Sequence, residues 1–158
     1  MHVRPARGDD YEPICALLSA VDARHHAALP ERFNPTSAPA RPRDWLDAKL
    51  SAPDAALLLA EEEGAALGLV DVHEAAAPQI PLFVPRRYAV VDQLVVADAR
   101  HRQGVGRALM DAAHQWARAR GLTQVELNVY EFNEGARAFY AALGYETLSR
   151  KLGRSLEA

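Results

Sequence analysis

Two glycines follow an apolar stretch of the chain, and their setting suits an anion. Residues 90–96 are apolar except at Asp92 and Gln93, which is typical of a strand buried on both faces. The chain then turns and is expected to enter a helix at Gly104. Gly104 and Gly106 carry no Cβ, and the first N–H groups of a helix have no internal partner. This arrangement favours phosphate or pyrophosphate, because the helix dipole adds positive charge at the same point.

Three arginines, Arg100, Arg102 and Arg107, add full positive charge around these glycines. Two common phosphate motifs are excluded. A dinucleotide fingerprint needs a further glycine where this chain has Leu109, and a P-loop needs Gly-Lys-Ser/Thr, which does not occur. An ordinary strand-to-helix turn remains the alternative for this segment.

Length and composition limit the classes of protein to consider. The chain has 158 residues, which suits a single domain spanning 1–158, and its net charge of −3 argues against a nucleic-acid partner. Cys15 is the single cysteine, so no disulfide can form within the chain, and a cytoplasmic, reducing compartment is expected. We expect no secretory signal and no membrane partner, because no long apolar run occurs. His25 and His26 are adjacent without metal-ligand spacing, so no metal is expected.

The hydrophobic pattern predicts a mixed α/β (α+β) domain. A helix is expected after Asp9 or Asp10, and glycines at 121 and 144 are expected to end the last two helices. A mixed sheet with helices on its faces follows from the order of elements. The expected strands are 3–6, 55–60, 65–73, 90–96, 125–130 and 145–152, and the expected helices are 10–29, 44–50, 104–120 and 133–143. Residues 74–87 are expected to be irregular because of three prolines.

A second group of residues lies near the C-terminus. Asn133, Ala136 and Tyr140 are spaced i, i+3 and i+7, which places them on one helix face. The small alanine leaves a shallow gap between two polar side chains. A capped helix with an aromatic core face is the alternative explanation.

The two groups together resemble the GNAT superfamily of acetyl-CoA-dependent N-acetyltransferases. The resemblance rests on HRQGVGRALM and, one helix and one strand later, on NEGARAFYAALGYE. One position departs from the family pattern, because His101 stands where the family has Arg or Gln. The matching positions are Gly104, Gly106, Asn133, Ala136, Phe139, Tyr140, Gly144 and Tyr145.

The resemblance covers nearly the whole chain and implies a fold and a co-substrate. The implied fold is a mixed central sheet of about six to seven strands, splayed between the fourth and fifth strands, with helices on both faces. The implied co-substrate is acetyl-CoA, without a metal. Backbone N–H groups of 102–107 would hold its pyrophosphate, and 94–96 would pair with the pantetheine arm. The implied binding residues are Leu94, Val95, Val96, His101, Arg102, Gln103, Gly104, Val105, Gly106, Arg107, Asn133, Ala136 and Tyr140.

Catalytic roles follow from what acetyl transfer to an amine needs. The amine must lose a proton before it attacks. Asp92 is the first candidate base, because burying a carboxylate in a strand is costly and its presence there suggests a function. Glu126, Glu74 and water remain alternatives. A backbone N–H near Val95 could stabilise the oxyanion, and Tyr140 could protonate the departing CoA thiolate.

The sequence therefore predicts an N-acetyltransferase that uses acetyl-CoA and acts in a ternary complex. The acceptor is a primary amine of a small molecule or a protein, and its pocket is expected to form from 22–44 and 74–88. A non-catalytic acyl-CoA-binding sensor or interaction module is the alternative. The resemblance also implies that a homodimer can form, and the sequence does not indicate which surface would be its interface.

Overall fold

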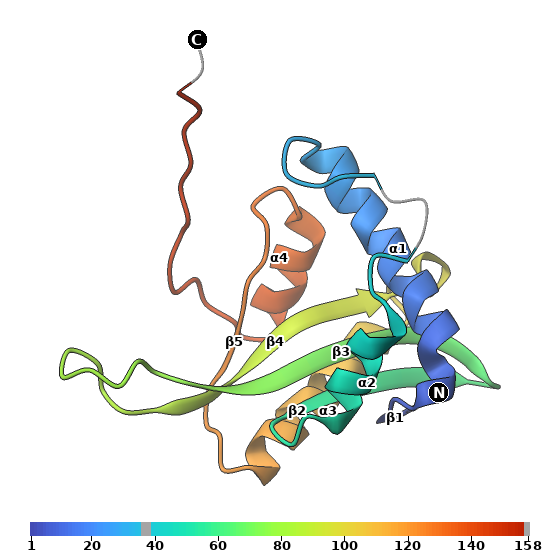
Figure 1. Ribbon diagram of the computed structural model, residues 1–158, viewed down its shortest axis with the longest axis horizontal. Helices are drawn as coiled ribbons and strands as arrows, with labels where there is room; N and C mark the ends of the chain where they lie inside the picture. The colour runs from blue at the N-terminus through green and yellow to red at the C-terminus, as the bar shows by residue number, and fades with distance from the viewer. Residues whose placement is uncertain (36–38, 157–158) are drawn as a thin grey trace. The chain divides into compact units, whose positions relative to one another are not determined.

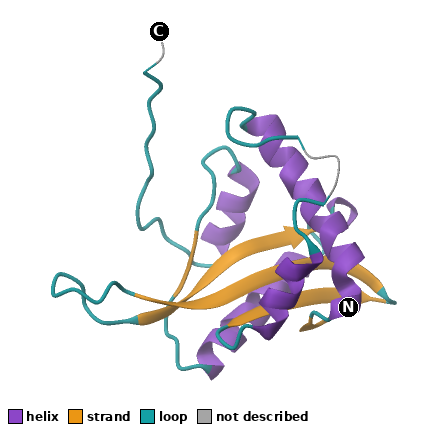
Figure 2. Cartoon of the chain, viewed as in Figure 1, coloured by secondary structure: helices purple, strands orange, loops and turns teal. Residues whose placement is uncertain are grey.

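A computed structural model describes residues 1–35 and 39–156 of the chain (Figures 1 and 2). It divides into two compact units, which we describe separately. Unit 1 is Met1–Asn128 and unit 2 is Val129–Ala158. A single domain over 1–158 remains a prediction. Among the described residues, no helix has the length and apolar character needed to cross a membrane.

Unit 1 is built on one mixed sheet of five strands, ordered β1-β2-β3-β4-β5. Neighbouring strands from β1 to β4 run antiparallel, whereas β4 and β5 run parallel. The prediction of six to seven strands was wrong, because the described part of 145–152 forms no strand. The strands are β1 (His2–Pro5), β2 (Ala55–Glu62), β3 (Ala65–Ala76), β4 (Arg87–Val96) and β5 (Val125–Leu127).

Helices cover both faces of this sheet, as predicted. Leu69 of β3 lies in a buried cluster with Ile14 of α1 and Leu46 of α2, whereas a Cβ on neighbouring Gly68 would lie 3.1 Å from Leu109 of α3. Consecutive strand residues point to opposite faces, so α1 and α2 cover one face and α3 the other (Figure 1). The helices are α1 (Tyr11–Ala28), α2 (Arg43–Ser51), α3 (Val105–Ala119) and, in unit 2, α4 (Glu134–Ala142), with short 3-10 turns η1 (Gly8–Asp10) and η2 (Asp98–Arg100).

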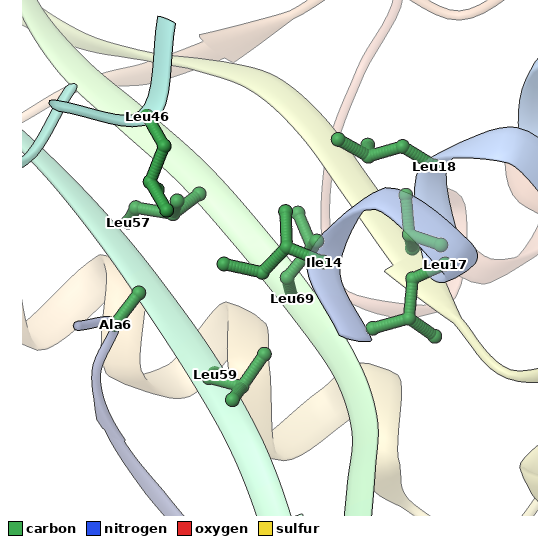
Figure 3. Packing of buried hydrophobic residues seen from close by; sticks show 9 residues of the cluster. Ala6, Ile14, Leu17, Leu18, Leu46, Leu57, Leu59 and Leu69 are labelled. Atoms are coloured by element: carbon green, nitrogen blue, oxygen red, sulfur yellow. The ribbon is translucent and has the colours of Figure 1, made fainter. Parts of the chain in front are cut away.

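The core under α1 and α2 is made of aliphatic side chains from five elements and the segment after β1 (Figure 3). Ile14, Leu46 and Leu69 are completely buried there. Close packing of this kind fixes α2 over β2 and β3, and so fixes the side chains that α2 presents at its edge. The cluster contains Ala6, Ile14, Leu17, Leu18, Leu46, Leu57, Leu59, Leu69 and Val95.

The pairing between β4 and β5 is short. Three residue pairs join Ala89–Val91 to Val125–Leu127, and β4 then continues to Val96. The parting of the two strands agrees with the predicted splay. The predicted strand 125–130 is correspondingly shorter, since β5 ends at Leu127.

The segment 74–87 is less irregular than its prolines predicted. β3 continues to Ala76 and β4 begins at Arg87, so the two strands form a longer hairpin than expected. The three prolines lie between these ends, where no ladder hydrogen bond is required.

Candidate active site

The loop before α3 presents bare backbone to solvent. Gly104 is the N-cap of α3, and its φ of 83° lies in the left-handed region that favours glycine. Arg102 also has a positive φ, of 60°. No side chain caps this helix, and its first turn carries no acidic residue. The start of α3 is therefore uncapped, and the anion site expected there stays a prediction.

The arginines of the loop are not equivalent. Arg100 Nη1 lies 3.4 Å from Glu62 Oε2, so its charge is partly offset. Arg102 and Arg107 are exposed and form no ion pair with any residue that the structure describes. These two guanidinium groups, rather than all three, are the ones that can meet a phosphate.

His101, the position that departs from the family pattern, is turned back onto the strand. Its Nε2 lies 3.0 Å from the carbonyl oxygen of Val96. A carbonyl only accepts, so this ring nitrogen must carry the hydrogen. His101 thereby fixes the exit of β4 into the loop, which gives it a structural role.

The segment 94–96 lies beyond the last β4–β5 pair, at the strand edge that β5 leaves. Val95 is buried in the core, whereas its neighbours are half-buried. On the other side, β3 approaches closely at Gly68, where a Cβ would lie 2.4 Å from the carbonyl oxygen of Val95. Only glycine permits this approach, so Gly68 positions the backbone that was predicted to meet pantetheine.

Asp92 occupies a β-bulge. Asp71 pairs with Gln93 and Val72 pairs with Val91, so Asp92 is an extra residue without a partner on β3. Its side chain is 38% exposed, which means that the expectation of a strand buried on both faces was wrong here. A bulge re-aims a side chain, and here it turns the carboxylate toward α2 and His73.

Four side chains meet around this bulge, which we call the bulge cluster: Lys49, Asp71, His73 and Asp92. Lys49 Nζ of α2 lies 2.6 Å from Asp71 Oδ2 and 3.4 Å from Asp92 Oδ2. His73 Nδ1 lies 2.9 Å from the same Asp92 oxygen. The imidazole is thus oriented by a carboxylate, which is the arrangement that prepares a histidine for proton transfer.

Asp71 is the buried member of the bulge cluster. Its exposed fraction is 1%, and its Oδ1 has no hydrogen-bond partner among the described residues. Burial raises the pKa of Asp71, and Lys49 opposes that rise. For Lys49, burial lowers the pKa, but the two carboxylates together raise it above its ordinary value. Lys49 is therefore charged at neutral pH and holds the cluster together.

A cavity of about 370 Å³ opens beside the bulge cluster. Its walls combine aromatic, small apolar and charged side chains, which is the usual composition of a small-molecule site. They are Trp45, Ala48, Lys49, Ala52, Asp54, Ala55, His73 and Asp92. Six of these eight residues come from α2, the start of β2 and the segment between them, outside the segments predicted to form the acceptor pocket.

The two alternative bases are each bound to an arginine. Glu74 pairs with Arg87, which lowers the pKa of Glu74. Glu126 Oε1 lies 2.8 Å from Arg86 Nη1. Neither carboxylate lines the cavity beside the bulge cluster.

Unit 2 contains the second predicted group of residues. The side chain of Asn133 accepts a hydrogen bond from the N–H of Ala136 at 3.1 Å, which confirms it as the cap of α4. Tyr140 packs edge-on against Phe139 and Tyr145. Burial raises the pKa of Tyr140 to about 12, so its hydroxyl keeps its proton at neutral pH. Gly144 ends the helix with a φ of 87°, as predicted.

Comparison with known proteins identifies the family. The acetyltransferase (GNAT) family matches residues 21–145, a span that includes both the loop before α3 and α4. The chain belongs to this family. Within the described residues, no group of three or more His, Cys, Asp or Glu could hold a metal ion.

One curated protein and two solved structures are similar to this chain over most of their length. Aminoglycoside N(6')-acetyltransferase type 1 of Klebsiella aerogenes is 28% identical over 107 residues, covering 68% of this chain and 69% of the relative. The solved structure of a mutant BH1408 protein from Bacillus halodurans is 25% identical, with a TM-score of 0.95 over 99% of this chain and 100% of that one. An aminoglycoside 6'-N-acetyltransferase from Acinetobacter haemolyticus shares the fold, with 15% identity and a TM-score of 0.72 over 100% and 99% of the two chains.

The sequence named the GNAT loop and Asp92 as candidates but did not indicate the other three members of the bulge cluster. Lys49, Asp71 and His73 lie on α2 and β3, and no local motif joins them. One signal was available, because Asp71 interrupts the apolar run 67–72 and a charge there needs a partner.

Proposed function

We propose that this GNAT protein transfers an acetyl group from acetyl-CoA to a primary amine of a small molecule. The observation that carries the proposal is the uncapped start of α3 beside the free edge of 94–96. Two relatives with aminoglycoside acetyltransferase names support a small-molecule amine as acceptor. A protein amine is the other acceptor class.

The residues of the loop would bind the co-substrate. Backbone N–H groups of 102–107, together with Arg102 and Arg107, would hold the pyrophosphate, since the start of α3 has no side-chain cap and the two exposed guanidinium groups form no ion pair with the described residues. The backbone of 94–96 would accept the pantetheine arm as an added strand. These are the roles that the sequence predicted.

The bulge cluster would remove the proton from the acceptor. An ammonium group cannot attack, and a lysine-like amine with a pKa of about 10.4 is rarely neutral at pH 7. Asp92 Oδ2 already interacts with His73 and Lys49, whereas His73 borders the cavity and has no second hydrogen bond among the described residues. We therefore assign the removal of the acceptor's ammonium proton to the His73–Asp92 pair. In this pair Asp92 orients the imidazole ring of His73.

The transfer then balances as follows. The ammonium proton passes to the His73–Asp92 pair, and the nitrogen lone pair forms a bond to the thioester carbonyl carbon. The carbon–sulfur bond would break, and the CoA thiolate would take a proton from Tyr140, whose hydroxyl is still protonated at neutral pH. The second proton that the attacking nitrogen loses as it becomes an amide would return to Tyr140 through water, so that the net release is one proton, held by the His73–Asp92 pair. The N–H of Val95 is proposed to stabilise the oxyanion. No covalent enzyme intermediate is required.

A calorimetric titration with acetyl-CoA tests the proposal, with NAD as the control ligand. Saturable binding of acetyl-CoA alone, followed by thiol release with a panel of amines, is the expected result. A Tyr140→Phe variant should then lower kcat and leave acetyl-CoA affinity unchanged. Binding without turnover on any amine would instead favour the acyl-CoA sensor, and absence of binding would refute both.

A further inference from the structure

One side of α2 lines the cavity beside the bulge cluster. Trp45, Ala48 and Lys49 are spaced i, i+3 and i+4, so they lie on the same side of the helix. Ala52 follows at the C-cap of α2 and belongs to the same wall. The two alanines have small side chains, so the cavity has room beside the aromatic ring of Trp45. All residues of this wall belong to unit 1.

Two carboxylates line this cavity, and only one of them has a counter-charge. Asp92 Oδ2 lies 2.9 Å from His73 Nδ1 and 3.4 Å from Lys49 Nζ. Lys49 also binds the buried carboxylate of Asp71, so its single charge already faces two carboxylates. The exposed carboxylate of Asp54 forms no hydrogen bond and no ion pair with any residue that the structure describes. The cavity therefore has an excess of negative charge, which attracts a cation.

The backbone around Asp54 is held by hydrogen bonds from two other elements. The carbonyl oxygen of Asp54 accepts one from the N–H of Glu74 in β3, at 2.8 Å. The carbonyl oxygen of Pro53 accepts another from Arg120 Nη2, which follows α3, at 2.6 Å. The guanidinium group of Arg120 also lies over the ring of Trp116. A carboxylate on a backbone fixed in this way loses little freedom when it binds a ligand, so Asp54 is suited to specific binding.

We propose that the acceptor carries a second cationic group, which Asp54 binds while the reacting amine lies beside His73. This inference rests on the proposed acetyl transfer, because it assigns the acceptor to the same cavity. An ammonium or guanidinium group forms a charge-assisted hydrogen bond with the carboxylate of Asp54. The ring of Trp45, in the same wall, adds a cation–π contact. The substrate class is thus a small diamine, or an amine that also carries a guanidinium group.

Asp54 also discriminates against amines of other kinds. A hydroxyl group in place of the second cation gives Asp54 a neutral partner, which forms a weaker hydrogen bond. A carboxylate in that place, as in an amino acid, meets Asp54 with like charge and is repelled. Proton removal and acceptor specificity therefore belong to different residues of one cavity, His73 with Asp92 for the first and Asp54 for the second.

Thiol release from acetyl-CoA with matched acceptors tests this assignment. The acceptors are diaminobutane, aminobutanol and aminobutanoate, which differ only at the far end, together with their propane, pentane and hexane homologues. At the best length, kcat/KM should be at least about tenfold higher for the diamine than for the amino alcohol, and lowest for the amino acid. The two equivalent amines of the diamine account for only about a factor of two in that ratio, since kcat/KM counts the reactive groups.

Substitutions of Asp54 should change this order of acceptors. Asp54→Asn should reduce the ratio of diamine to amino alcohol to about the statistical factor, because the charged partner is lost. Asp54→Lys should reverse the preference between the diamine and the amino acid. The matched control is Asp47→Asn, which removes an exposed carboxylate of α2 outside the cavity wall and should keep the wild-type ratio. Circular dichroism confirms that each variant is folded.

A calorimetric titration with diaminobutane, without acetyl-CoA, separates the cation site from the reaction. The wild type should bind the diamine, and Asp54→Asn should bind it at least about tenfold more weakly. Diamine binding without thiol release from any amine would refute the acetyl transfer and support the cation site. Thiol release without a preference for the diamine, or with a preference that survives in Asp54→Asn, would overturn the cation site and leave the acetyl transfer standing. Absence of both binding and thiol release would refute both.

Discussion

The loop before α3 and the bulge cluster are built in opposite ways. The loop is one continuous stretch, and its binding groups are mostly backbone N–H groups shaped by Gly104. The bulge cluster joins side chains from α2, β3 and β4, with Lys49 and Asp92 43 residues apart. A site of the first kind depends on local conformation and tolerates changes of side chain. A site of the second kind fails when any member is removed, because its charges are mutually dependent.

The largest expected effect of breaking the bulge cluster is on stability. Lys49→Met leaves Asp71 buried without its cation, and removing one partner of a buried ion pair costs about 3–5 kcal/mol. Urea unfolding at pH 7 measures this loss. Burial raises the pKa of Asp71, and a group with a raised folded pKa contributes stability that is lost as the pH rises through that pKa. The loss in Lys49→Met should therefore shrink as the pH falls and Asp71 becomes protonated.

Two variants control this measurement. Lys151→Met removes an exposed lysine of the C-terminal segment and should change unfolding by less than about 0.5 kcal/mol. Lys49→Met/Asp71→Asn removes the buried charge together with its cation and should recover much of the loss. Equal stability of Lys49→Met and the wild type would show that the pair does not hold α2 to the sheet.

The next effect concerns turnover of the proposed reaction. With the best amine from the thiol-release screen, His73→Gln and Asp92→Asn should each lower kcat/KM at pH 7 by about 100-fold, the usual scale of general-base catalysis. The loss of kcat/KM should diminish at high pH, because more of the amine is then already neutral and needs no base. Acetyl-CoA affinity measured by calorimetry should not change, since neither side chain belongs to the loop.

Glu126→Gln is the matched control, because Glu126 is a carboxylate that Arg86 already binds. It should keep most of the activity. A pH–rate profile with the same shape in His73→Gln as in the wild type would remove His73 from the mechanism, and the corresponding result for Asp92→Asn would return the role to Glu74, Glu126 or water.

The same contrast explains what could be predicted from the sequence. The conformations of the loop and of the helix caps at Asn133, Gly121 and Gly144 depend on neighbouring residues only. Each has a residue type that favours its backbone conformation, so each could be predicted from the sequence. The bulge at Asp92 has no such mark, because it depends on how β3 and β4 align over their whole length. The expected burial of Asp92 failed for that reason.

The strand predicted at 145–152 failed for a different physical reason. A strand requires a partner as well as a suitable pattern, and the described residues of one chain provide none for this segment. The prediction rested on the segment's own residues and named no strand with which 145–152 would pair.

A smaller effect is expected from straining the loop. Gly104→Ala places a Cβ at φ 83°, which costs about 1–2 kcal/mol although no atom lies within 4 Å of it. Gly135→Ala is the matched control, because Gly135 also has open space but lies inside α4, where alanine should gain about 0.5–1 kcal/mol. Thermal unfolding of both variants measures the difference. Opposite signs are expected, and equal shifts would mean that the left-handed conformation carries no cost here.

The smallest effect separates backbone from side chain within the loop. Arg102 has a positive φ of 60°, so Arg102→Gly relieves local strain, while Arg102→Ala removes the same charge and keeps the strain. If backbone N–H groups do most of the binding, both variants should weaken acetyl-CoA binding by less than tenfold, which is about 1.4 kcal/mol. Arg102→Gly should also unfold at a higher temperature than Arg102→Ala. Calorimetry measures the affinity for acetyl-CoA, and thermal unfolding measures the strain. A loss of affinity well above tenfold in both variants would show that the guanidinium group provides much of the binding energy. The loop would then depend on single side chains, as the bulge cluster does.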